Sequence, residues 1–250
     1  MTTEPGQPTT EPGQPMAEPG QLTTGLAGRT AVVTGTAHGI GAAIAEALRR
    51  DGASVFGIDK EDVDVTDPAA VEDFFAEAGY VDILVNCAGG VVGQVGHPVE
   101  RVSPADWLAV LNANLTSAFL CTRAVVPGMK ERRWGRIVNI SSAAGLTVSK
   151  TGIQAYTSAK AGQIGFTRQM AKELGPFGIT VNCIAPGFIR SNPTSERQWE
   201  SYGEEGQRHL IEGIATRRLG DPADIANGVQ FFVSERSAWE IGRASCRERV

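Results

Sequence analysis

A short apolar strand that leads directly into a glycine-rich turn and a helix constrains this chain more than any other feature. Glycines at such a turn let the backbone approach a pyrophosphate, which then lies at the positive N-terminus of the helix. The pattern predicts a dinucleotide site inside a β-α-β unit; the alternative is a tight turn without a ligand. The strand is Thr30–Thr34, the turn is Gly35–Gly41, and the helix has apolar residues at Ile40, Ile44, Ala47 and Leu48.

Strand-like and helix-like segments alternate through most of the chain. Strands that are apolar on both faces are typical of a parallel sheet covered by helices on both sides, so we expect a doubly wound α/β fold. Too few residues follow Asp59 for the crossover of about a dozen residues that a parallel neighbour needs. We therefore expect the third, edge strand to be abbreviated or lost. The expected strands are 30–34, 54–58, 82–85, 136–140 and 179–184, and the later helices begin near 103, 155 and 222.

Composition limits the function classes. The 250 residues, 42% of them hydrophobic, fit a single domain. A net charge of −5 argues against nucleic acid as a partner. Apolar runs of four to six residues are far shorter than the roughly 20 that cross a bilayer, so we expect no membrane span and no secretory signal. The four widely spaced cysteines lack a CxxC pair, so we expect reduced thiols in a cytoplasmic protein and no metal site.

The two ends differ from the rest. Residues 2–8 (TTEPGQP) recur as 9–15, and Met16 begins a decayed third copy. With so little apolar surface, residues 1–22 are expected to be disordered; a docking tail is the alternative. The last ten residues, Ile241–Val250, resemble the translation of a sequencing adapter. We expect them to be non-native, the domain proper to span 23–240, and the last strand to be missing through C-terminal truncation.

Six motifs occur here in the order found in the short-chain dehydrogenase/reductase family, which the chain resembles from about Leu26 to Trp239. Any one of them is a weak signal, and all six in order are a strong one. The resemblance implies a single Rossmann-type α/β domain, an NAD(P)-dependent oxidoreductase, and a homotetramer or homodimer. The motifs are Thr34-Gly35-x-x-x-Gly39-x-Gly41, Asn86-Cys87-Ala88-Gly89, Asn114, Ser142, Tyr156-x-x-x-Lys160 and Pro186-Gly187.

The resemblance implies that Asn114, Ser142, Tyr156 and Lys160 are catalytic. Hydride transfer at an alcohol carbon needs a group that moves the hydroxyl proton, and a tyrosine with a pKa near 10 is unsuited to this at neutral pH. Lys160, one helical turn away, would favour the phenolate, and Ser142 would hydrogen-bond the substrate oxygen. Asn114 resembles an asparagine that holds a relay water. The alternatives are an asparagine bonded back onto its own helix and an exposed Tyr–Lys pair.

The preferred cofactor is NAD, with NADP as the alternative. Asp59 follows Gly41 by 18 residues, and a carboxylate there would accept the ribose hydroxyls of NAD and repel the 2′-phosphate of NADP. A solvated loop acid is the alternative, and the adjacent Lys60 weakens the preference for NAD. The expected cofactor-binding residues are Gly35, His38, Gly39, Ile40, Gly41, Asp59, Asp64, Val65, Asn86, Ala88, Gly89, Tyr156, Lys160, Pro186, Gly187, Ile189 and Ser191.

The substrate is expected to be a small alcohol or ketone. Residues 190–218 should form a lid whose arginines and aromatic residues suit a polar or anionic substrate, unless those arginines are simply solvated. We expect hydride transfer between nicotinamide and a small polyol, sugar or cyclic alcohol. The alternatives are an NADPH-dependent 3-oxoacyl-carrier-protein reductase and a dinucleotide-sensing module without turnover. Two departures from the family pattern are Cys87, where a second asparagine is common, and Ser191, where a threonine is usual.

Overall fold

The computed structural model of the chain describes residues 24–149 and 151–247. Six strands form one sheet in the order β2-β1-β3-β4-β5-β6, and every neighbouring pair is parallel. The repeats expected to be disordered lie outside the described residues. The strands are β1 (Thr30–Thr34), β2 (Ser54–Ile58), β3 (Ile83–Asn86), β4 (Gly135–Ile140), β5 (Ile179–Pro186) and β6 (Ala244–Arg247).

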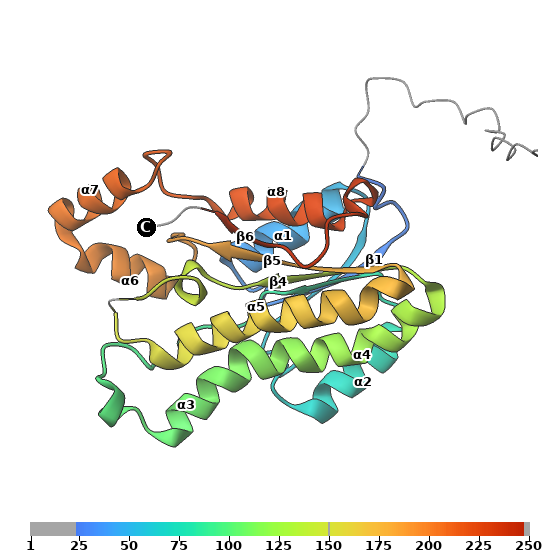
Figure 1. Cartoon of the computed structure of the whole chain (residues 1–250), viewed down its shortest axis with the longest axis horizontal. Coiled ribbons are helices and arrows are strands. Elements are labelled where there is room, and N and C mark those ends of the chain that lie inside the picture. Colours follow the sequence, from blue (N-terminus) through green and yellow to red (C-terminus); the bar gives the residue numbers. More distant parts are fainter. Residues whose placement is uncertain (1–23, 150, 248–250) are drawn as a thin grey trace, which may run out of the picture.

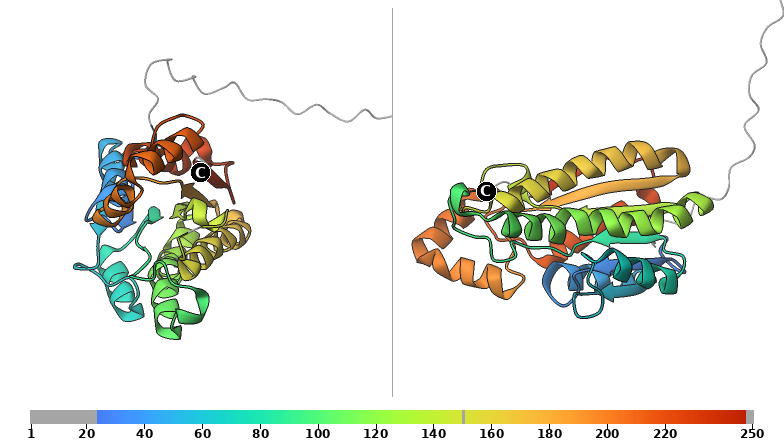
Figure 2. Two further views of the ribbon diagram at one scale, coloured as in Figure 1. Left: turned by 90° about the vertical axis from the view of Figure 1, so that its left-hand side faces the viewer. Right: turned by 90° about the horizontal axis from the view of Figure 1, so that it is seen from below.

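Helices cover both faces of the sheet, as expected for a doubly wound fold (Figures 1 and 2). One face packs against α1 and α8, and the other packs against α2, α4 and α5. Two further helices, α6 and α7, project beyond one end of the sheet (Figure 1). The helices are α1 (Gly39–Arg50), α2 (Pro68–Ala78), α3 (Pro104–Leu111), α4 (Ser117–Arg132), α5 (Gln154–Leu174), α6 (Pro193–Ser201), α7 (Gly203–Gly213) and α8 (Pro222–Val233).

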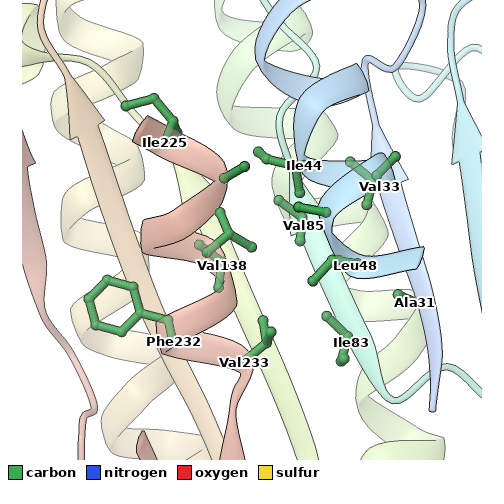
Figure 3. Packing of buried hydrophobic residues seen from close by; sticks show 14 of the residues in the cluster. Ala31, Val33, Ile44, Leu48, Ile83, Val85, Val138, Ile225, Phe232 and Val233 are labelled. Carbon is green, nitrogen blue, oxygen red and sulfur yellow. The ribbon is translucent and has the colours of Figure 1, made fainter. Parts of the chain in front are cut away.

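Alternation along each strand divides the core into two clusters. On β1, Ala31 and Val33 point to the α1/α8 side, and Val32 points to the other side. On the α1/α8 side, Leu48 of α1 and Val233 of α8 are fully buried against the sheet (Figure 3). The four inner strands β1, β3, β4 and β5 are buried along almost their whole length, and their apolar runs are the pattern from which the sequence predicted a parallel sheet.

The edge of the sheet beside β2 confirms the expected loss of a strand. After β2 the chain turns at once, with the N–H groups of Asp62 and Val63 both donating to the carbonyl of Asp59. Asp67 then caps α2 by accepting from the N–H of Ala69. Among the described residues no strand lies outside β2.

At the opposite edge the expectation of a missing last strand is wrong. Residues Ala244–Arg247 form β6, in register with β5 from Cys183 to Pro186. The chain approaching β6 is held through its own N–H groups: that of Gly242 donates to the carbonyl of Val181, and that of Arg243 donates to the side chain of Asn182. Edge pairing uses N–H and C=O groups that every non-proline residue has, so the buried edge of β5 can be paired by almost any extended segment.

Two other expectations concern membranes and cysteines. The helical stretch Pro104–Arg132 is long and apolar enough to cross a membrane, but 44% of its most apolar window is buried in the fold, and core helices of soluble proteins pass the same test. Cys87, Cys121 and Cys183 form no disulfide within the described part of the chain, and Cys121 and Cys183 are buried.

Candidate active site

The strand order reverses between β1 and β3, which places a crevice at their carboxyl ends, where α/β sheets bind ligands. The glycine turn follows β1, and the segment from Cys87 to Gly89 follows β3. Thr34 joins them because its hydroxyl accepts the N–H groups of Cys87 (3.0 Å) and Ala88 (2.9 Å). Gly35 has a φ of +76°, and a Cβ there would lie 2.9 Å from the Cα of Ala88. The approach of these two loops therefore requires glycine.

The N-terminus of α1 is open to an anion. His38 is in the N-cap position but makes no side-chain capping bond, and the first turn of α1 contains no acidic residue. The first N–H groups of the helix therefore have no side-chain cap, and no acidic side chain of the first turn competes for them. A Cβ on Gly41 would collide with the carbonyl oxygen of Gly35, and Ile40 beside it packs against the core. These residues fit the pyrophosphate of a dinucleotide, which is the chemistry that the glycine motif predicted.

Asp59 lies at the crevice as expected. One carboxylate oxygen accepts the N–H of Ala37 in the glycine turn (2.8 Å), and the other accepts the N–H of Lys60 (2.8 Å). The carboxylate is thus fixed beside the glycine turn. Asp64 is differently engaged: its carboxylate accepts the hydroxyl and N–H of Thr66, which lowers the pKa of Asp64. The neighbouring Val65 packs against the core.

The side chain of Asn86, an expected cofactor-binding residue, is buried inside the protein. It is 2% exposed and donates to Asn139 on β4 (2.8 Å) and to Thr122 on α4 (3.3 Å). The physical reason is the strand period: Asn86 shares the parity of Leu84, which packs on the α2/α4/α5 side. Asn86 joins β3 to β4 inside the protein.

The segment after β5 closes over the glycine turn. Pro186 ends β5, Gly187 follows it, and the buried Ile189 makes an isolated parallel bridge with Gly220. Ser191 lies against Gly39, because a Cβ on Gly39 would lie 2.9 Å from the Cβ of Ser191. The structure therefore brings together the residues expected from both motifs.

The lid combines aromatic contacts with ion pairs. Phe188 stacks with Trp199 at 6.2 Å between ring centroids. Arg190 pairs with Glu196 at 2.7 Å, and Arg218 pairs with Asp224 at 2.6 Å. Arg190 is thus paired within the expected lid and Arg218 is paired with α8, which weakens the argument for an anionic substrate.

Tyr156 and Ser142 form the centre of the candidate site. Ser142 follows β4, and Tyr156 lies in the first turn of α5. Burial raises the pKa of Tyr156, and the nearby Ser142 side chain acts in the opposite direction. The phenol is thus protonated at neutral pH.

Lys160 lies one turn along α5 and is 3% exposed. Its Nζ is 5.6 Å from the centre of the Tyr156 ring and donates to the carbonyl of Ile140 at 2.8 Å. Burial lowers the pKa of Lys160 to about 8. Because that value is still above neutral, the ammonium can act on Tyr156 at pH 7.

Asn114 is fully buried in a π-helical turn, Asn112–Thr116, between α3 and α4. Its amide donates to the carbonyl of Val110 on its own helix (2.8 Å), as in the core-asparagine alternative. The same amide also donates to the carbonyl of Gly90 (2.8 Å) and accepts the N–H of Gly90 (3.0 Å). A Cβ on Gly89 would meet the Asn114 amide. The side chain therefore fixes the loop after β3.

Gln163 belongs to the site and was not predicted. It is fully buried, accepts from Lys160 Nζ (3.1 Å), and donates to the main-chain carbonyl of Asn114 (2.9 Å). A signal was available in the sequence: Lys160, Gln163 and Thr167 are polar at spacings i, i+3 and i+7, which share one face of a helix. That face is buried in the structure.

A dinucleotide crevice beside a tyrosine, a serine and a lysine defines an NAD(P)-dependent oxidoreductase that acts on CH–OH or keto groups. The model of the short chain dehydrogenase family matches residues 61–201, which is more than half of the chain. The chain belongs to this family.

Relatives match nearly the full length. The (2S)-[(R)-hydroxy(phenyl)methyl]succinyl-CoA dehydrogenase subunit BbsD of Thauera aromatica is 38% identical over 88% of this chain and 94% of its own. The 3-oxoacyl-[acyl-carrier-protein] reductase FabG of Vibrio cholerae is 36% identical over 87% of this chain and 94% of its own. A crystal structure with bound NADP, described as an NAD(P)-dependent gluconate 5-dehydrogenase from Beutenbergia cavernae, has a TM-score of 0.82 and 29% identity, covering 90% of this chain and 96% of that one.

Proposed function

We propose that the protein interconverts a secondary alcohol and a ketone, with Tyr156 as the general acid and base. The observation that supports this most directly is the buried Lys160 ammonium, 5.6 Å from the centre of the Tyr156 ring, with Ser142 acting on the same phenol. Bound NAD(P) supplies the hydride acceptor or donor.

In this mechanism the two hydroxyls bind the substrate oxygen. In reduction Tyr156 donates its proton to the oxygen as charge develops there, and Ser142 stabilises that charge by a hydrogen bond. In oxidation the phenolate accepts the proton. The Lys160 ammonium lowers the cost of the phenolate in both directions.

Replacing Tyr156 tests the mechanism. Tyr156→Phe removes only the hydroxyl, so we expect kcat to fall by about 100-fold or more while nucleotide binding, followed by NADH fluorescence, is retained. A variant that binds NADH and turns over at the parent rate across a panel of alcohols and ketones would contradict this role. The non-catalytic sensing alternative predicts no turnover in either protein.

We further propose a preference for NAD, supported by the fixed carboxylate of Asp59 beside the glycine turn. Initial rates at equal concentrations of NADH and NADPH test it. Asp59→Ser should raise kcat/KM with NADPH by about tenfold, because it removes the negative charge that would face the 2′-phosphate. Glu61→Ser is the matched control, since it removes an exposed acid two residues away. Equal use of both cofactors by the parent protein would contradict the preference.

For the substrate we propose a small polyol, sugar or cyclic alcohol. The structural match to a protein described as a gluconate 5-dehydrogenase is consistent with that class. A second candidate is a 3-oxoacyl thioester, favoured by the names of the two relatives, one acting on an acyl-carrier-protein substrate and the other on a CoA thioester. Rates over polyols, cyclic alcohols and 3-oxoacyl thioesters, each with NADH and NADPH, separate the two.

We also propose a homotetramer or homodimer in the cytoplasm. Phe119 on α4 is 45% exposed and contacts Phe166 on α5 edge-on, so these neighbouring helices present apolar surface. Light scattering of the purified protein tests the assembly, and a monomeric mass would contradict it.

A further inference from the structure

Gln163 lies between two residues of the candidate site. It follows Lys160 by one turn of α5 and has no exposed surface. Its Oε1 accepts from the Lys160 ammonium at 3.1 Å, and its Nε2 donates to the main-chain oxygen of Asn114 at 2.9 Å. One amide therefore connects the lysine to the π-helical turn.

These two partners fix the orientation of the amide. If it were reversed, its NH₂ group would face the Lys160 ammonium and its oxygen would face the Asn114 carbonyl. Two donors would then face each other, and so would two acceptors. The oxygen of Gln163 is consequently directed at a cation, where a hydrogen bond is stronger than one between neutral groups.

The charges around Lys160 show why this acceptor matters. Tyr156, Cys87 and Cys183 are the titratable groups that face it. Burial raises the pKa of the Cys87 thiol to about 12 and that of Cys183 to about 11, so both are neutral at pH 7. No ion pair within residues 24–149 and 151–247 includes Lys160. Neutral oxygens of Ile140 and Gln163 therefore hold the buried charge.

We propose that Gln163 is a positioning residue for proton transfer, whose oxygen keeps Lys160 charged beside Tyr156 and whose nitrogen ties it to the backbone of Asn114. The proposal rests on the function proposed above for Tyr156 and Lys160. It also changes the connection expected between Lys160 and Asn114. A carboxamide passes on a proton only through its imidic acid form, so this link supports the lysine and is not a proton path.

A second set of buried bonds holds Gln163 itself. Its main-chain oxygen accepts the hydroxyl of Thr167 (2.8 Å), which accepts from Asn139 (2.9 Å). Asn139 in turn accepts from Asn86 (2.8 Å). The bonds run from α5 through β4 to β3, so the burial of Asn86 becomes part of the support for the site.

The test measures the pKa of Lys160 directly by NMR of protein with ¹³C-labelled lysine, without substrate. The chain has only five lysines, Lys60, Lys130, Lys150, Lys160 and Lys172, so the resonance can be assigned by its loss in Lys160→Arg. Gln163→Met removes the acceptor at similar volume and should lower the pKa of Lys160 by about one unit. Gln163→Glu places a carboxylate there and should raise it.

Matched controls separate this role from packing. Gln169→Met makes the same change at an exposed position on α5 and should leave the pKa unchanged. The alkaline limb of kcat for ketone reduction should move with the pKa, in opposite directions in the Met and Glu variants, with KM nearly constant. A purely structural defect would move both variants in the same direction.

A Lys160 pKa that is unchanged in Gln163→Met, or that falls equally in both variants, would overturn the proposal. Melting temperatures identify a variant that fails to fold. If Gln163→Met does not fold, Gln163→Asn is measured instead; it keeps the amide but shortens its reach, so the pKa of Lys160 should fall in the same way. Because the NMR titration needs no turnover, it can succeed even if Tyr156→Phe shows that the proposed function is wrong.

Discussion

Two buried cations, Lys160 and Arg136, lie at opposite ends of strand β4 and differ in what their charges can do. Lys160 and Arg136 are each 3% exposed. Lys160 donates to the carbonyl of Ile140, the last residue of β4, and Arg136 is the second residue of that strand. Burial lowers the pKa of both. Only the lysine reaches a value near neutrality, about 8.

The groups around Arg136 stabilise a guanidinium that stays charged. Its guanidinium lies 4.4 Å from the centre of the Trp134 ring, and Arg29 lies 3.7 Å from the same ring. Arg136 also donates to the carbonyls of Gly135 (2.9 Å) and Gly178 (3.4 Å). Arginine stays protonated in such a place, whereas a buried lysine titrates readily. The amino end of the sheet therefore uses a cation for structure, and the carboxyl end uses one whose charge can change.

Removing each cation gives the largest contrast. Lys160→Met should lower kcat by about 100-fold or more, because the phenolate of Tyr156 loses its stabilising charge. Arg136→Met should leave kcat within about a factor of two, since it lies at the far end of β4. Steady-state kinetics at pH 7 measure both. An equal loss of kcat in the two variants would show that Lys160 and Arg136 do not differ in their importance for turnover.

Of these two cations, only Lys160 should make the unfolding free energy depend on pH above neutrality. The folded pKa of Lys160, about 8, lies below the ordinary lysine value of 10.5, so burying the charged form costs stability below pH 8 and the cost disappears as the pH rises toward 10.5. The gain in unfolding free energy from Lys160→Met should therefore shrink by about 2 to 3 kcal/mol between pH 7 and pH 10.

Arg136→Met provides the comparison for that measurement. Arginine does not titrate in this range, so its effect on the unfolding free energy should be the same at both pH values. Urea unfolding of the parent and both variants at pH 7 and pH 10 measures the difference. A lysine effect as flat as the arginine effect would mean that Lys160 keeps an ordinary pKa.

Much of the fold was predictable because apolar strands and helical spacing directly reflect burial. The helix α2 was not predicted, since only Val71 and Phe75 of it are buried and its apolar pattern is correspondingly weak. β6 was not predicted because edge pairing depends on backbone groups, which a side-chain pattern does not report.

For the site, the sequence predicted contacts between residues of the same helix but not contacts between different elements. Tyr156 and Lys160 are neighbours on one helix, so their meeting follows from the sequence. The burial of the Asn86 side chain did not follow from the sequence, because a motif does not state which face of a strand its residues occupy. The contact of Gln163 with Asn114 joins residues from two different helices, and only the packing of α5 on the π-helical turn shows it.

The smallest expected effect concerns the ring between the two arginines. Trp134→Leu keeps an apolar side chain but removes the π face that Arg29 and Arg136 share, so we expect the unfolding free energy to fall by about 2 kcal/mol. Neither kcat nor the NMR pKa of Lys160 should change, because no charge near β4's carboxyl end is altered. A stability loss accompanied by a shifted Lys160 pKa would show that β4 couples its two ends. An unchanged pKa together with the loss would show that Arg136 and Lys160 act independently, although one strand connects their sites.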